Sequence, residues 1–121
     1  MKKLYDGMIG LAIGDALGVP VEFKTRQEIE ENPVREMREY GTHHQARGVW
    51  SDDTSLTLAL VDSIVKCSGI DYKDIMERFS SWLLYGDYTA AGEVFDVGNA
   101  TGRAIMNYGH GTAPLQCGMV S

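Results

Sequence analysis

Trp50-Ser51-Asp52-Asp53-Thr54 opens the most regular stretch of this sequence. Behind it, apolar side chains recur four residues apart, at Leu56, Leu60 and Ile64. This spacing predicts a helix from Ser51 to about Ser68-Gly69, where glycine favours termination. Two adjacent aspartates repel each other, so their pairing beside a hydroxyl calls for an explanation. A hard divalent cation, which takes oxygen ligands, is one explanation. Capping of the helix by Ser51 or Asp52 is the other.

The remaining sequence also reads as helical, without a convincing alternating strand. Helices are expected over residues 3–18, 26–31, 71–86 and 98–108, from apolar periodicity and flanking glycine or proline. Residues 38–49 show little periodicity and are expected to form a surface loop, and residues 109–121 an irregular tail. A length of 121 residues suits one domain, here of the all-α class.

The first predicted helix presents glycine along one face, at Gly7, Gly10, Gly14 and Gly18. Glycine destabilises a helix interior by about 1 kcal/mol per site. Such a bare face therefore suggests close approach by another helix or by a ligand, and the sequence leaves both open. Asp15, on the same helix, is expected to make buried hydrogen bonds rather than to bind a metal. Pro20 ends the helix and turns the chain toward Glu22.

Charge and cysteine content restrict the class of protein. Eleven basic against 17 acidic residues give a net charge of −6, and the absence of a basic run argues against a duplex nucleic acid partner. Cys67 and Cys117 match neither a zinc spacing nor a disulfide framework, which suits a reducing cytoplasm. Asp6 and Asp15 interrupt the apolar N-terminal run, so we expect neither a signal peptide nor a membrane span.

Four carboxylates stand at predicted helix ends and come from separate segments: Glu22, Asp52, Asp53 and Asp96. If they converge, they suit metal-assisted hydrolysis, in which ions orient the substrate and one carboxylate moves a proton. Two other polar sites have simpler interpretations. The adjacent His43 and His44 are expected to be solvated loop residues, and Asp62 to lie on a solvated helix face.

Three motifs in order resemble one known family. They are Gly14-Asp15-Ala16-Leu17-Gly18 followed by Glu22, then Trp50-Ser51-Asp52-Asp53-Thr54, and then Phe95-Asp96-Val97-Gly98-Asn99-Ala100-Thr101. They look like the signature of the ADP-ribosylglycohydrolases, which include the dinitrogenase reductase-activating glycohydrolases. The likeness runs from about Leu4 to Ile105.

The resemblance implies an all-α orthogonal bundle that carries two magnesium or manganese ions and hydrolyses ADP-ribosyl linkages. Ser51, Asp52 and Asp53 would be metal ligands, and Glu22 the acid/base or water-positioning carboxylate. Asp96 would contact water, metal or ribose. Arg47 and the loop from Gly41 to Gly48 would help to hold the diphosphate. ADP-ribose or an ADP-ribosylated protein would be the partner.

The sequence also departs from the family pattern. Family members are at least twice this length, and their second ligand block, Asp-x-Asp-[Ser/Thr], is absent here. We therefore expect an apparently truncated chain that corresponds to the N-terminal half of the enzyme, with at most weak binding of a single ion. Its exposed apolar stripes should be covered by self-association or by a protein partner. A non-catalytic module that binds a protein, as an inhibitor or regulator, or that binds ADP-ribose, stays open as an alternative.

Overall fold

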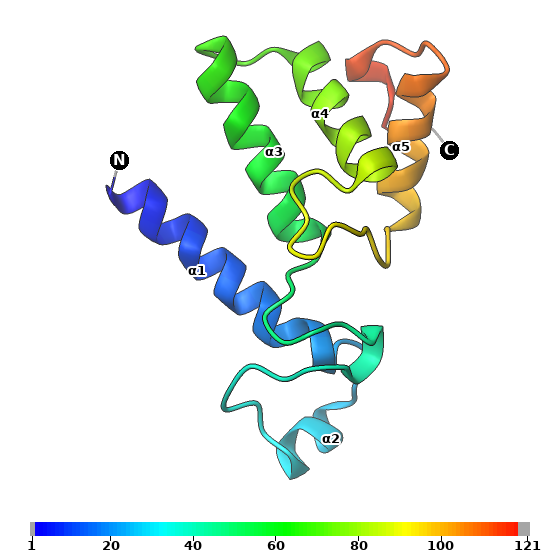
Figure 1. Ribbon diagram of the computed structural model, residues 1–121. Coiled ribbons are helices and arrows are strands. Elements are labelled where there is room, and N and C mark those ends of the chain that lie inside the picture. The colour runs from blue at the N-terminus through cyan, green and yellow to red at the C-terminus, as the bar shows by residue number, and fades with distance from the viewer. Residues whose placement is uncertain (1, 119–121) are drawn as a thin grey trace. The chain divides into compact units, whose positions relative to one another are not determined.

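The computed structural model describes residues 2–118, and its regular elements are helices joined by loops (Figure 1). Its α-helices are α1 (Lys2–Gly18), α2 (Arg26–Glu31), α3 (Asp52–Cys67), α4 (Tyr72–Tyr85) and α5 (Asn99–Gly109). Short 3₁₀ turns are η1 (Val19–Val21), η2 (Gly41–His43) and η3 (Pro114–Gln116). Within residues 2–118 there is no strand beyond an isolated bridge between Tyr40 and Gln45. The predicted all-α class is confirmed, and each predicted helix is found close to its expected bounds.

The chain divides into two compact units, residues 1–54 and residues 55–121, and the division falls in the first turn of α3. The expected organisation as one domain stays a prediction. In the first unit, a capping box begins α2. The Thr25 hydroxyl accepts from the Glu28 amide at 3.1 Å, and the Glu28 carboxylate accepts from the Thr25 amide at 3.2 Å. This reciprocal pair explains why so short and polar a helix has a defined start.

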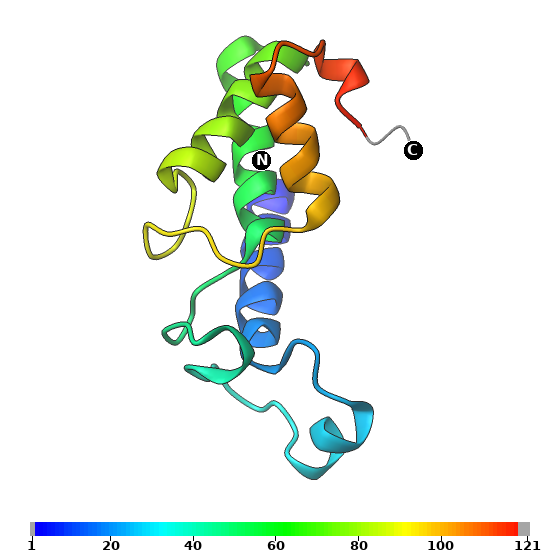
Figure 2. The same cartoon turned by 90° about the vertical axis from the view of Figure 1, so that its right-hand side faces the viewer.

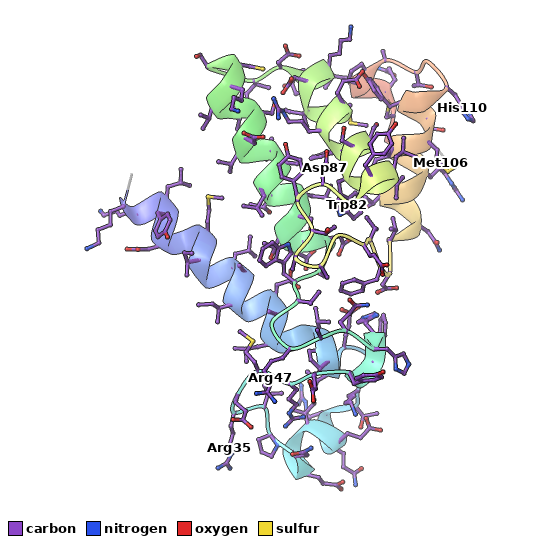
Figure 3. All side chains as sticks on the ribbon, viewed as in Figure 1. Arg35, Arg47, Trp82, Asp87, Met106 and His110 are labelled. Atoms are coloured by element: carbon purple, nitrogen blue, oxygen red, sulfur yellow. The ribbon has the colours of Figure 1, made fainter. Side chains whose placement is uncertain are left out.

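In the second unit, α4 and α5 lie side by side, as both views show (Figures 1 and 2). The Asp71 side chain caps α4 by accepting from the Asp74 amide at 3.0 Å, and Gly86 ends α4 with a left-handed φ of 74°. Trp82, labelled in Figure 3, is the largest fully buried side chain, with 1% of its surface exposed. It provides the main apolar anchor of this unit.

A polar network joins α3, α4 and the loop after α4. The Tyr88 hydroxyl donates to the Asp62 carboxylate at 2.7 Å, and the Arg78 guanidinium donates to the same carboxylate at 2.8 Å. Burial of the Tyr88 phenol, reinforced by its bond to Asp62, raises the pKa of Tyr88. Asp62, which was expected on a solvated helix face, is 32% exposed and also pairs its charge with Arg78 of α4. The paired groups fix the start of the loop that leads to Asp96.

α1 exposes much of its apolar surface. Five of its large apolar side chains are between 39% and 67% exposed: Leu4, Tyr5, Ile9, Leu11 and Ile13. By length and composition alone, the segment Lys2–Val21 would be able to cross a membrane, although core helices of soluble proteins meet the same criterion. Asp15 lies inside this segment and bonds to protein groups, which does not suit a lipid-facing helix. The absence of a membrane span therefore stays a prediction.

The chain after α5 was expected to be irregular. Its described part folds back on the helix: the Asn107 side chain donates to the Cys117 carbonyl at 3.2 Å, and Cys117 is buried. The short η3 turn is its regular element. Residues 119–121 of the expected tail lie outside the described residues.

Candidate functional site

Asp15 ties α1 to the start of α3. One carboxylate oxygen, Oδ1, accepts from the Ser51 hydroxyl at 2.6 Å. The other, Oδ2, accepts from the Ser51 amide at 2.8 Å, the Thr54 amide at 3.3 Å and the Thr54 hydroxyl at 2.7 Å. A carboxylate facing the free amides of a helix N-terminus is a favourable cap. The predicted hydrogen-bonding role of Asp15 is therefore confirmed, and it fixes the position of the Ser-Asp-Asp segment.

Ser51, Asp52 and Asp53 stand at this capped helix start. The Ser51 hydroxyl gives its hydrogen to Asp15 and accepts from the Asp53 amide at 3.3 Å. A hydroxyl oxygen has two lone pairs, so one lone pair of Ser51 is left to offer to an electron-pair acceptor. Burial, and then the negative charge of Asp53, raise the pKa of Asp52. These hard oxygen donors fit a magnesium or manganese ion.

A pocket of about 680 Å³ runs along the glycine face of α1. Gly10, Gly14 and Gly18 line it, and so do Asp15, Glu22 and Asp53. Within residues 2–118, no atom beyond their own helix and chain neighbours lies within 4 Å of where a Cβ would stand on these glycines. The described structure thus shows no close helix packing at this face. Whether a further helix or a ligand approaches this face stays open, and Glu22 and Asp53 line the same pocket.

Asp96 belongs to the second unit. It lies in the loop between α4 and α5, is exposed and adopts a left-handed φ of 50°. Two residues later, Gly98 stands at the N-cap of α5. A left-handed conformation in a residue other than glycine is often found at functional sites. The convergence of Asp96 with the pocket carboxylates stays a prediction.

His43 differs from its expected state. Its side chain is only 9% exposed, and Nε2 lies 3.5 Å from Oε2 of Glu22, whose side chain is 42% exposed. The prediction that His43 is a solvated loop residue is therefore wrong, whereas His44 is exposed as expected. No local pattern marks His43, because its burial comes from contact with a turn some 20 residues earlier in the chain.

Arg47, labelled in Figure 3, is exposed and lies in the same connecting loop as His43. It is not among the residues that line the pocket. The role in diphosphate binding implied for Arg47 and for the loop Gly41–Gly48 therefore stays a prediction.

The fold and the site define an all-α protein with an oxygen-rich, capped helix start beside a glycine-lined pocket. The family model "ADP-ribosylglycohydrolase" matches residues 1–121. This chain belongs to the ADP-ribosylglycohydrolase family.

Named relatives give the same result. The chain is 33% identical over 108 residues to "ADP-ribosylarginine hydrolase Tri1" of Serratia proteamaculans, with 89% of this chain and 29% of the relative covered. It is 37% identical over 117 residues to "ADP-ribosyl-[dinitrogen reductase] glycohydrolase" of Rhodospirillum rubrum, with 89% and 35% covered. A solved "ADP-ribosylglycohydrolase-related protein complex" matches with a TM-score of 0.69 at 37% identity, over 88% of this chain and 32% of that one. The chain thus spans about a third of the length of these relatives.

Proposed function

We propose that this chain supplies part of a metal-dependent hydrolase of ADP-ribosyl linkages. The main support is that Glu22 and Asp53 line the same pocket, which runs along the glycine face of α1. Family membership supports the reaction class, since the relatives are named as hydrolases of ADP-ribosylarginine and of ADP-ribosyl-dinitrogen reductase. We further propose that the chain works in a reducing compartment such as the cytoplasm, which suits its free Cys67 and Cys117.

Ser51, Asp52 and Asp53 would hold the divalent ion. Bound magnesium or manganese would supply Lewis-acid polarisation and would orient the ribose or the attacking water. The residues of the chain would do the rest. The Asp15 carboxylate accepts hydrogen bonds from both the hydroxyl and the amide of Ser51. These bonds keep the three ligands at the rigid start of the helix. Three oxygen ligands and a few waters hold such an ion weakly, so we expect a single, weakly held ion at this segment.

Glu22 would move the proton. Glu22 lines the pocket and follows the turn that contains the buried Pro20. General acid/base catalysis by a positioned carboxylate contributes about 10²- to 10⁴-fold to a rate. Asp96 would contact water, metal or the ribose.

The experiment is release of free ADP-ribose from ADP-ribosyl-arginine by the purified chain, with magnesium, manganese or a chelator. We expect metal-dependent release that is lost in the Asp52→Ala/Asp53→Ala double variant. Release that continues in chelator, or in the folded double variant, would contradict the proposed site. If the folded wild-type chain released nothing, catalysis by this chain alone would be excluded. The alternative of a non-catalytic ADP-ribose-binding or protein-binding module would then be favoured.

The exposed apolar side chains of α1 support a proposal on assembly. Tyr5, Ile9 and Ile13 share one side of the helix by their spacing and are 67%, 44% and 47% exposed, and exposed apolar surface of this kind usually marks an interface. We propose that a second copy of the chain covers this face, and that another protein partner is the alternative. Sedimentation should show association at micromolar concentrations that Ile9→Glu/Ile13→Glu abolishes without unfolding the chain. A wild-type chain that stays monomeric up to about 100 µM would exclude self-association in the micromolar range, which corresponds to a binding free energy of about 8 kcal/mol.

A further inference from the structure

The loop that carries His43 is fastened to the turn that carries Glu22. The Thr42 hydroxyl donates to the Glu22 carbonyl at 2.6 Å and lies 3.4 Å from the Pro20 carbonyl. Gly41 adopts a φ of 56°, and a Cβ at this position would collide with the backbone of Pro20. The loop thus follows the turn closely at two consecutive residues, which sets where the next residue, His43, is placed.

His43 is directed at the Glu22 side chain from this fastened loop. Its buried ring brings Nε2 to 3.5 Å from Oε2 of Glu22, and the Phe23 ring meets the imidazole edge-on at 5.9 Å between centroids. The neighbouring His44 instead places its ring against Tyr40, with centroids 5.6 Å apart. His43, and not the adjacent His44, therefore faces the Glu22 carboxylate.

The backbone around this pair is strained. Phe23, Tyr40 and His44 have left-handed φ values of 67°, 65° and 53°. Residues other than glycine rarely adopt this backbone conformation. It persists where the surrounding structure enforces it, and it is common near functional sites. The strain accompanies a loop and a turn that meet at Glu22 and His43.

We propose that His43 is a positioning residue for the Glu22 carboxylate. Nε2 holds Oε2 and leaves Oε1 for proton transfer toward the pocket. This inference rests on the proposed acid/base role of Glu22. The 3.5 Å separation is longer than a hydrogen bond. Catalytic hydrogen bonds are commonly long before substrate binds and shorten in the reacting complex.

A double-mutant cycle on stability tests the pair without any catalysis. The variants are His43→Leu, Glu22→Gln and the double variant, each unfolded in urea. We expect the pair to be coupled by roughly two- to fivefold in the unfolding equilibrium constant, at the low end of the coupling found for side chains in direct contact. The matched control is His110→Leu with Glu22→Gln, because His110 is an exposed histidine after α5. Additivity in the His43 cycle, equal to that of the control, would overturn the proposal.

Kinetics of ADP-ribose release then separate positioning from a structural role. We expect His43→Leu to lower kcat by roughly 10- to 100-fold with KM within about twofold, since misplacement of a catalytic group has this effect. His43→Gln, which retains an N–H donor, should recover most of kcat, and His110→Leu should match the wild type. Equal kcat in His43→Leu and the wild type would overturn the proposal. If the wild type releases nothing, the proposed function fails, and the stability cycle alone decides whether His43 holds Glu22.

Discussion

Replacing Asp15 by alanine is expected to lower the free energy of unfolding by about 3 kcal/mol. The substitution removes an N-terminal cap, which contributes about 0.5–2 kcal/mol. It also removes acceptors from the hydroxyls of Ser51 and Thr54, and hydrogen bonds to a charged group contribute roughly 1.5–3 kcal/mol. These contributions overlap, so the expected loss is smaller than their sum. Urea unfolding of the wild type and the variant measures the difference.

Two variants make this test specific. Asp15→Asn should also destabilise the chain, by about 2 kcal/mol, because its amide group offers a donor where Asp15 offers an accepting oxygen. Asp6→Ala removes an exposed carboxylate from the same helix and should change stability by no more than about 0.5 kcal/mol. An Asp15→Ala variant as stable as Asp6→Ala would show that the capping contacts do not hold this helix start.

The second large expected effect is stabilisation of the folded chain by a bound metal ion. An ion that binds the folded chain stabilises it by RT ln(1 + [L]/Kd), or about 1.4 kcal/mol at roughly ten times Kd. For a chain of this size that raises Tm by about 5 °C. We expect manganese to produce such a rise in the wild type and none in Asp53→Asn. Thermal unfolding followed by circular dichroism, with and without the ion, measures it.

A second aspartate provides the control for this experiment. Asp87 is exposed in the loop after α4, and Figure 3 labels it. Asp87→Asn removes one negative charge, as Asp53→Asn does, but leaves the Ser51–Asp53 donor set intact. It should keep the full rise in Tm. Loss of the rise in Tm in both variants would mean that the net negative charge of the chain, and not the Ser51–Asp53 donor set, attracts the ion.

Most of the helices were predictable from local features of the sequence. Periodic apolar residues place α3 and α4, and local capping groups define the ends of α4 and the start of α2. Asp71 caps the start of α4, Gly86 its end, and Thr25 forms the capping box of α2. Each of these contacts joins residues within about four positions, so the sequence pattern contains the information that defines them.

The contacts that build the site were less accessible because they join distant residues. The sequence predicts buried hydrogen bonds for Asp15, but not that the donors stand 36 and 39 positions away at Ser51 and Thr54. His43 was assigned to solvent, although contact with the turn at Glu22 buries it. Neither periodicity nor propensity encodes such pairings, which depend on how the loop between α2 and α3 returns to η1.

The candidate site rests on motifs rather than on spacing, and the roles of its residues stay predictions. Glu22 and Asp53 line a common pocket, as the resemblance to the family implies. The glycine pattern of α1 left helix packing and ligand approach equally open, and only the structure shows that Gly10, Gly14 and Gly18 face the pocket. A bare face is the same in sequence whether a helix or a ligand fills it.

Direct titration of manganese, followed by electron paramagnetic resonance of the free ion, tests the central claim that the Ser51–Asp53 segment is a metal site. We predict that the wild-type chain binds about one ion weakly, as an incomplete oxygen donor set would. Asp53→Asn should bind none, and Asp87→Asn should match the wild type. Equal binding by wild type and Asp53→Asn, or no binding by either folded chain at millimolar manganese, would contradict the account.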